Sequence, residues 1–187
     1  MRPEAESAAG LALFATAIGS CGIAWGERAL LAVQLPEASE AATLARLRRH
    51  LRGTPVRETA PPPWVMQAIA RIQALLAGQH DNLADIPLEM EGVPAFNRRV
   101  YEIARAIAPG STLTYGEVAQ RLGERGAARA VGQALGHNPF APVVPCHRVL
   151  AARSGPGGFS AEGGVATKLR MLQIEKARMG SEPGLFD

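Results

Sequence analysis

The residues best suited to carry chemistry are a cysteine and the histidine directly after it, Cys146 and His147. A thiol is a good nucleophile only as the thiolate, and a nearby imidazole is the usual way to lower its pKa. The run 138–144 before them contains two prolines and two β-branched residues, so we predict an extended, stiffened segment. Neighbours on a strand point to opposite faces, so contact between the two side chains requires a tight turn or a bridging water. We interpret Cys146 as a reactive thiol rather than a buried structural one.

A catalytic imidazole needs an acid to orient it, and Glu175 is the candidate. It lies on an apolar stripe of a predicted last helix over 164–178. The alternative is an exposed helix glutamate paired with Lys176 or Arg178. Asn138, before a proline, is either a turn residue or a group that holds the backbone beside the thiol.

The elements around these residues are predicted to be mainly helices. One helix starts at Pro94, taken as its first residue, and runs to about 107 before Pro109 and Gly110 end it. Thr114 and Glu117 have the spacing of a capping box that starts a helix ending at Gly123. A second short helix follows over 127–135. Two short helices joined by a tight turn indicate a helix-turn-helix, although hairpins of this kind also occur in proteins that do not bind DNA.

The first half of the chain reads as mixed α and β. The pattern predicts strands over 11–17 and 23–33 with turns at 19–20 and 26–27, helices over 39–51 and 61–77, and one short strand near 86–90.

Charge is distributed unevenly along the 187 residues, whose net charge is +3. Residues 1–93 hold 8 Lys/Arg and 10 Asp/Glu, which is −2, and residues 94–187 hold 12 and 7, which is +5. Ordinary surface charge accounts for such an excess, and so does an anionic partner for the second half.

Composition excludes several classes of protein. Two cysteines, Cys21 and Cys146, are too few for a disulfide framework, so we expect a cytoplasmic setting. No apolar run approaches a membrane span, and the first residues lack a signal-peptide pattern. Cys21, His50 and His80 have no metal-ligand spacing, and no phosphate-binding or dinucleotide motif occurs, so we expect neither metal nor cofactor.

Several motifs in order resemble those of the O6-alkylguanine-DNA alkyltransferases, or methylated-DNA–protein-cysteine methyltransferases. The match covers about residues 92–178 and rests on Thr114-Tyr115, Ala128-Arg129-Ala130-Val131-Gly132, Asn138-Pro139, Pro145-Cys146-His147-Arg148-Val149, Gly158-Phe159-Ser160 and Glu175. The resemblance implies an α/β, RNase H-like domain with its linker over 1–91. It also implies a mostly helical, winged-helix-like domain over 92–187 that contains the helix-turn-helix.

In that family the reaction is DNA repair without a cofactor. The resemblance implies that Cys146 takes the alkyl group from O6-alkylguanine, and also from O4-methylthymine, in double-stranded DNA. His147 would relay the thiol proton through water, Glu175 would stabilise the imidazolium, and Asn138 would hold the active-site turn. The thioether is permanent, so one molecule repairs one lesion, and we expect it to act as a monomer.

The resemblance also assigns the contacts to DNA and to the flipped base. Arg129 would fill the gap in the base stack, and Tyr115 would crowd the phosphate 3′ to the target. Thr114, Ala128, Ala130 and Gly132 complete the expected DNA-binding set. The base pocket would be lined by Val144, Pro145, Val149, Phe159 and Ser160.

Four other functions stay open. A lesion-binding alkyltransferase-like protein lacks the acceptor cysteine, and a methylation-responsive regulator normally needs an additional metal domain. A cysteine hydrolase with a Cys-His-Glu triad would turn over many times and needs an oxyanion hole. A DNA-binding module alone would not need Cys146.

Overall fold

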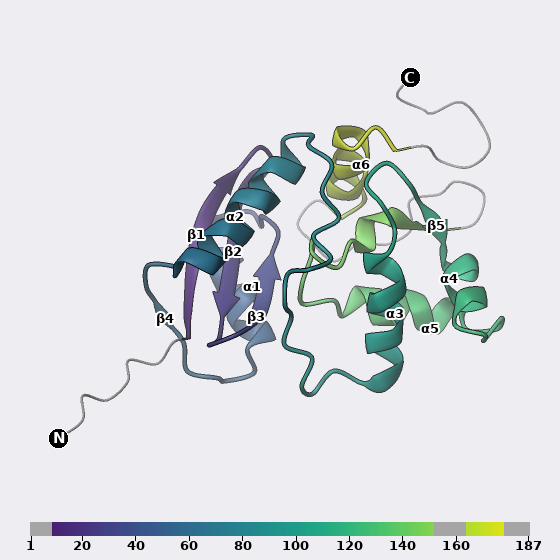
Figure 1. Cartoon of the computed structure of the whole chain (residues 1–187), viewed down its shortest axis with the longest axis horizontal. Coiled ribbons are helices and arrows are strands. Elements are labelled where there is room, and N and C mark those ends of the chain that lie inside the picture. Colours follow the sequence, from purple (N-terminus) through teal and green to yellow (C-terminus); the bar gives the residue numbers. More distant parts are fainter. Residues whose placement is uncertain (1–8, 152–163, 178–187) are drawn as a thin grey trace.

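The computed structural model describes residues 9–151 and 164–177, and it begins with a four-stranded sheet flanked by two helices (Figure 1). The strands β1 (Gly10–Thr16), β2 (Gly19–Trp25) and β3 (Leu30–Gln34) are antiparallel neighbours, and β4 (Arg57–Glu58) pairs parallel to β1. The strand order is therefore β3-β2-β1-β4.

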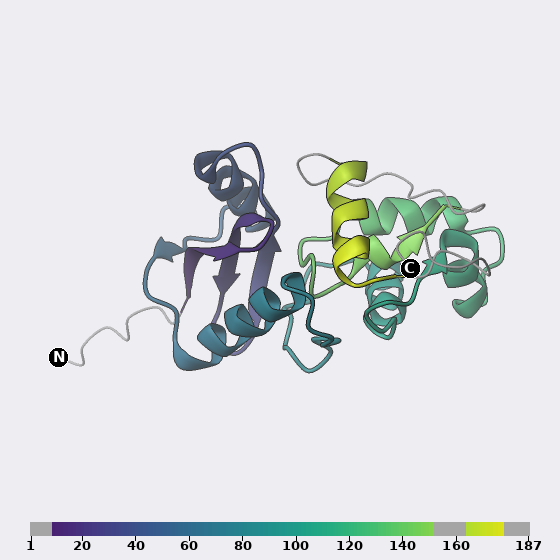
Figure 2. The same cartoon turned by 90° about the horizontal axis from the view of Figure 1, so that it is seen from above.

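Alternation of side chains along the strands gives this sheet two apolar faces. Phe14, Cys21 and Ile23 face the buried side chains of α2 (Pro63–Leu76). The intervening residues, such as Ala24, face α1 (Glu40–His50). Because side chains on a strand alternate with period two, each helix covers one face, as Figure 2 shows.

Three predictions for this half were wrong in detail. The run 23–33 is not one strand, because Gly26 N–H donates to Ala29 O across 2.9 Å and turns the chain between β2 and β3. The first turn lies at residues 17–18 rather than 19–20, since the Thr16 hydroxyl binds both Ile18 N–H and Gly19 O and closes it earlier. The short strand near 86–90 is an isolated bridge between Leu30 and Leu88.

The second half is mostly helical, so the fold is an α/β sheet part followed by a helical part. Its elements are α3 (Ala95–Arg105), β5 (Leu113–Thr114), α4 (Tyr115–Arg121), α5 (Ala128–Gly136), the 3₁₀ turn η1 (Cys146–Arg148), β6 (Val149–Leu150) and α6 (Val165–Ile174). Pro94 is the N-cap of α3 and not its first helical residue. The capping box at α4 is confirmed, with Glu117 N–H donating to the Thr114 hydroxyl at 3.0 Å.

The two halves share packing around the segment that leads to Cys146. At the sheet edge, Val33 N–H donates to Pro139 O across 2.9 Å. Val143 and Met171 lie in the same apolar cluster as α2 and the sheet. The sheet therefore supports both the active-site segment and α6. No helix among the described residues is long and apolar enough to cross a membrane.

Candidate active site

The prediction of an extended segment over 138–144 was wrong, because residues 141–143 form a turn, with Val144 N–H donating to Phe140 O at 3.1 Å, and Cys146 begins a second tight turn. Cys146 N–H donates to Val144 O at 2.8 Å, and Arg148 N–H donates to Pro145 O at 2.9 Å. The first bond closes a γ-turn centred on Pro145, with φ −81° and ψ 68°, and the second closes the 3₁₀ turn η1. Proline fixes φ alone, and ψ is set here by the hydrogen bonds that follow.

This turn brings His147 to Glu175, as the sequence predicted. His147 Nε2 lies 2.7 Å from Glu175 Oε1, and both side chains are buried. Glu175 is the C-cap of α6 and not an exposed helix glutamate. Among the described residues the cation on Glu175 is Arg148 and not Lys176, and Arg178 lies outside the described residues.

Arg148 holds the carboxylate of Glu175 through both oxygens. Its Nε donates to Oε2 at 2.9 Å and its Nη2 donates to Oε1 at 2.7 Å. Its Nη1 donates to Ile107 O at 2.8 Å, just beyond the end of α3. Burial would raise the pKa of the Glu175 carboxyl, but His147 and Arg148 outweigh burial and lower that pKa to about 2. The carboxylate is therefore ionised at neutral pH.

An ionised carboxylate only accepts hydrogen bonds, and this fixes the tautomer of His147. Nε2 must carry a proton in order to donate to Glu175, so in the neutral ring Nδ1 is the acceptor. Burial lowers the pKa of His147, and the pull of Glu175 in the opposite direction does not cancel that effect. Nδ1 is buried and has no hydrogen-bond partner among the described residues. The ring is thus a neutral base with one free lone pair.

The resting thiol differs from the sequence expectation. Burial raises the pKa of Cys146, although a hydrogen bond from Asn138 and the charge of Lys168 act against burial. The side chain is only 7% exposed. Cys146 is therefore a protonated thiol at rest, and a base must take its proton when it reacts.

Asn138 ties the segment before the thiol into one shape. Its Nδ2 donates to Val144 O at 2.8 Å, and its Oδ1 accepts from Phe140 N–H at 2.9 Å. Both bonds are buried, so the amide spans the loop from its start to the residue two before Cys146. Of the two open interpretations, the structure supports a group that holds the backbone beside the thiol.

Two buried cations in the site were missed by the sequence reasoning. Arg148 was seen only as part of a motif, and Lys168 was not considered. Lys168 Nζ donates to Val149 O at 2.6 Å and lies 3.4 Å from Tyr115 Oη, and burial lowers its pKa to about 8. The available signal was spacing, because Lys168 shares a face of α6 with Met171, Leu172 and Glu175.

The expected DNA-binding residues cluster at the start of α4 and along α5. Arg129 is exposed, whereas Ala128, Ala130 and Gly132 are half-buried. A methyl group on Gly132 would meet the Tyr115 ring at 3.8 Å, so α5 packs closely beside that ring. Thr114 is occupied in capping α4.

The expected base-pocket residues Val144, Pro145 and Val149 are all buried around η1. Phe159 and Ser160 lie outside the described residues.

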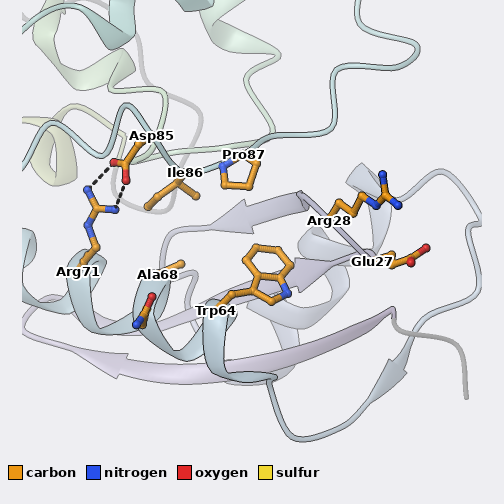
Figure 3. A pocket seen from close by; sticks show the side chains of 9 residues that line it. Glu27, Arg28, Trp64, Ala68, Arg71, Asp85, Ile86 and Pro87 are labelled. Carbon is orange, nitrogen blue, oxygen red and sulfur yellow. Dashed lines mark hydrogen bonds and ion pairs between the residues drawn. The ribbon is translucent and has the colours of Figure 1, made fainter.

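A hollow elsewhere on the surface contains none of these residues. It has a volume of about 400 Å³ and lies between α2 and the linker. Figure 3 shows Trp64 and Pro87 at its centre and the ion pair of Arg71 with Asp85 at one end. It belongs to the sheet half, away from the thiol. Within residues 9–151 and 164–177, no three His, Cys, Asp or Glu side chains are grouped to hold a metal ion.

Comparison with known proteins agrees with the site. The family profile described as "6-O-methylguanine DNA methyltransferase, DNA binding domain" matches residues 95–177. A methylated-DNA–protein-cysteine methyltransferase of Mycobacterium bovis is 40% identical over 69% of this chain and 76% of its own length. One from Methanothermobacter thermautotrophicus is 32% identical over 82% and 78%.

Solved structures extend the likeness to the first half. The crystal structure of Mycobacterium tuberculosis OGT in complex with DNA is 31% identical, with a TM-score of 0.72 over 89% of this chain and 92% of that one. An O6-methylguanine-DNA methyltransferase from Pyrococcus kodakaraensis superposes with a TM-score of 0.69 at 29% identity, over 89% of this chain and 98% of that one. This chain belongs to the methylated-DNA–protein-cysteine methyltransferase family.

Proposed function

We propose that Cys146 is the residue that accepts the alkyl group when this protein repairs O6-alkylguanine in DNA. Transfer from methylated DNA to a protein cysteine is the activity that names the family, and it makes this chain a DNA repair enzyme. The observation that carries the assignment to Cys146 is the buried chain of contacts from the η1 turn through His147 to Glu175 and Arg148.

The chemical step is a displacement at the alkyl carbon. Sulfur of Cys146 forms a C–S bond to that carbon while the bond from the carbon to guanine O6 breaks. The electron pair of the broken bond leaves with guanine, which takes up a proton. The product on the protein is a thioether, so each molecule acts once. The bond changes balance without a redox partner or a metal ion.

His147 would supply the base for this step. Its Nδ1 lone pair accepts the thiol proton through a bridging water, and the imidazolium that forms donates to Glu175 through Nε2. Asn138 would keep the thiol in line with the alkyl carbon by fixing the loop before it.

DNA would be bound by α4 and α5 acting as a helix-turn-helix. The exposed Arg129 would enter the stack in place of the flipped nucleotide, and Tyr115 would crowd the phosphate on its 3′ side. The small residues Ala128, Ala130 and Gly132, with Thr114 at the start of α4, would let α5 approach the groove closely. A crystallised relative, the M. tuberculosis protein, was solved with DNA.

Other parts of the assignment complete this proposal. The flipped base would sit against Val144, Pro145 and Val149, with Phe159 and Ser160 from the segment outside the described residues. Residues 1–91 would form an RNase H-like domain and 92–187 a winged-helix-like, alkyl-accepting domain. The protein would act as a monomer in the cytoplasm and accept O4-methylthymine as a second substrate.

A cysteine hydrolase is the second function that a Cys-His-Glu arrangement could serve. Turnover separates the two, since a hydrolase releases product repeatedly and the proposed transfer stops at one equivalent.

Mass spectrometry after incubation with a methylated duplex tests the proposal. We expect one equivalent of methyl, carried on the peptide that contains Cys146, and no transfer to Cys146→Ser. Cys21→Ser is the matched control, because Cys21 is also buried, its pKa is raised to about 12 by burial, and it lies in the sheet half. It should retain full transfer. Methyl on another residue, or more than one equivalent of released product, would overturn the assignment.

A further inference from the structure

Arg148 has no assigned part in the transfer, yet its side chain is among the most completely buried in the described chain. It is 1% exposed, and its guanidinium makes three hydrogen bonds. Two go to Glu175 and the third goes to the main chain after α3, so the cation is fixed from two sides. Burying an arginine this deeply is costly unless its charge is paired.

The pairing matters because Glu175 Oε1 accepts from two groups at once. Arg148 Nη2 and His147 Nε2 each lie 2.7 Å from it. If His147 were protonated, its charge and that of Arg148 would both lie against one carboxylate. Lys168 is a third basic group nearby. Cys146 is the remaining titratable neighbour, and it is neutral at rest. The arrangement therefore disfavours a charged imidazole before the reaction.

We propose that Arg148 is a positioning residue that holds Glu175 by both oxygens, and so keeps His147 neutral with Nδ1 free to accept the thiol proton. This inference rests on the proposed function, in which His147 is the base. Without Arg148, the buried carboxylate of Glu175 would attract a proton to His147. That proton would occupy the Nδ1 lone pair that has to accept the thiol proton.

Two further features agree with this role. Arg148 and Lys168 both lower the pKa of His147, as burial does, and only Glu175 raises it. The third contact of Arg148, to Ile107 O, prevents the guanidinium from following the carboxylate if Glu175 moves. Arginine suits the position because its planar fork matches a carboxylate at two points, whereas lysine offers a single point charge.

The test is the pH dependence of single-turnover transfer from free O6-benzylguanine, which avoids any effect on DNA binding. In Arg148→Gln we expect the pKa of His147 to rise, because the ring loses a neighbouring cation. Transfer should then slow by about tenfold on the acid side, near pH 6, and far less near pH 8.5. A merely structural arginine would slow transfer equally at all pH values.

Three variants keep the test decisive. Arg148→Lys retains a cation, so the acid side of its pH–rate profile should lie closer to that of the parent protein than the profile of Arg148→Gln does. Arg99→Gln is the matched control, since Arg99 also pairs with a glutamate and a main-chain carbonyl but far from Glu175, and its profile should not shift. In a Glu175→Gln background, removing Arg148 should shift the acid side of the pH–rate profile less than it does in the parent protein, because only the direct repulsion between Arg148 and His147 is then lost.

A direct measurement covers the case in which Arg148→Gln does not fold. NMR titration of the His147 ring in the parent protein should give a pKa below 6.5. In Arg148→Lys the pKa should lie between that of the parent protein and that expected for Arg148→Gln. A parent pKa at or above 6.5, or a uniform loss of rate across pH, would overturn the inference. Failure of the parent protein to alkylate Cys146 would instead overturn the proposed function.

Discussion

His147 and Arg148, adjacent in the sequence, donate to the same oxygen of Glu175, each across 2.7 Å. Two neighbouring residues reach one carboxylate because the 3₁₀ turn at 146–148 replaces the strand geometry that would send them to opposite faces. The carboxylate comes from the C-cap of α6, which the sheet half holds in place through Met171. The imidazole that we propose as the base for the thiol is therefore oriented by an element that packs against the sheet half.

Replacing Glu175 by glutamine should slow alkyl transfer by about 10²-fold, the usual contribution of an oriented general base. The amide cannot stabilise the imidazolium as a carboxylate does. DNA affinity should change little, since Glu175 is buried away from the surface. Stopped-flow transfer rates and binding isotherms on one methylated duplex measure the two effects.

Glu102→Gln is the control for this change, because Glu102 is exposed on α3. It should leave both quantities unchanged. An unaltered transfer rate in Glu175→Gln would remove Glu175 from the proton path.

Stability should fall in acid because Glu175 is ionised in the folded state. Its pKa of about 2 lies below its value of 4.5 in an unfolded chain. A lowered pKa stabilises the fold above the unfolded value, and this contribution is lost as pH falls through the range from 4.5 toward 2. The lowered pKa of His147 acts in the same direction from pH 6.5 downward.

Urea unfolding at a series of pH values from about 7 to about 3 checks this expectation. The parent protein should lose stability steeply below pH 4.5, and Glu175→Gln should lose less over the same interval because its amide does not titrate. Equal slopes for the two proteins would contradict the assignment of the low pKa to Glu175.

Asn138→Ala should slow transfer and destabilise the fold together. It removes two buried hydrogen bonds and leaves Phe140 N–H without its partner, which costs about 1–3 kcal/mol, whereas Val144 O keeps its bond from Cys146 N–H. Asn82→Ala is matched to it, since Asn82 accepts from a main-chain amide two residues on, in an exposed turn. Thermal unfolding should show a large loss for the first variant and a small one for the second.

The main parts of the site could be predicted from local pattern. The pair Cys146-His147 follows three prolines, and the capping box at Thr114 needs only residues within one turn of the chain. Such features depend on residues that are neighbours in the sequence, and they are present in the structure. The orientation of Glu175 toward His147 was one of two open interpretations, because a catalytic imidazole requires an acid and Glu175 lies on the apolar stripe of the last helix.

The features that were not predicted depend on contacts between segments that are distant in the sequence. Arg148 reaches Ile107 O, 41 residues away, and Lys168 reaches Tyr115, 53 residues away. The periodic patterns of a sequence do not indicate which distant residues are in contact. The strand β4, only two residues long and exposed, was missed for the same reason, because it exists through its pairing with β1. The thiol pKa was misjudged because burial, a property of the whole fold, outweighs the local motif.

Binding to DNA should weaken as salt is added. Arg121 and Arg125 are exposed on or between α4 and α5, and phosphate contacts release counterions. A site that neutralises about two phosphates should lose roughly 12-fold in affinity when salt rises from about 50 to about 200 mM. Fluorescence anisotropy on a short duplex measures the slope. An affinity that does not depend on salt would contradict phosphate contacts by this face.

Arg129→Ala should separate repair of duplex DNA from the chemistry at sulfur. Arg129 is exposed on α5 and makes no contact with Cys146, His147 or Glu175, so transfer from free O6-benzylguanine should be unchanged. Duplex repair should slow by about tenfold or more, because an unfilled gap in the stack leaves several kcal/mol of unstacking uncompensated.

A single-stranded methylated oligonucleotide gives an intermediate case, since no partner strand has to be disrupted. Its repair by Arg129→Ala should suffer less than that of duplex. Arg125→Ala is the control: Arg125 is also exposed, and it lies in the turn before α5. Its loss should weaken binding to duplex and single strand alike and reduce the salt slope by about one. If Arg129→Ala instead slowed the free base and the duplex by the same factor, the residue would act on the site's structure and not in the DNA stack.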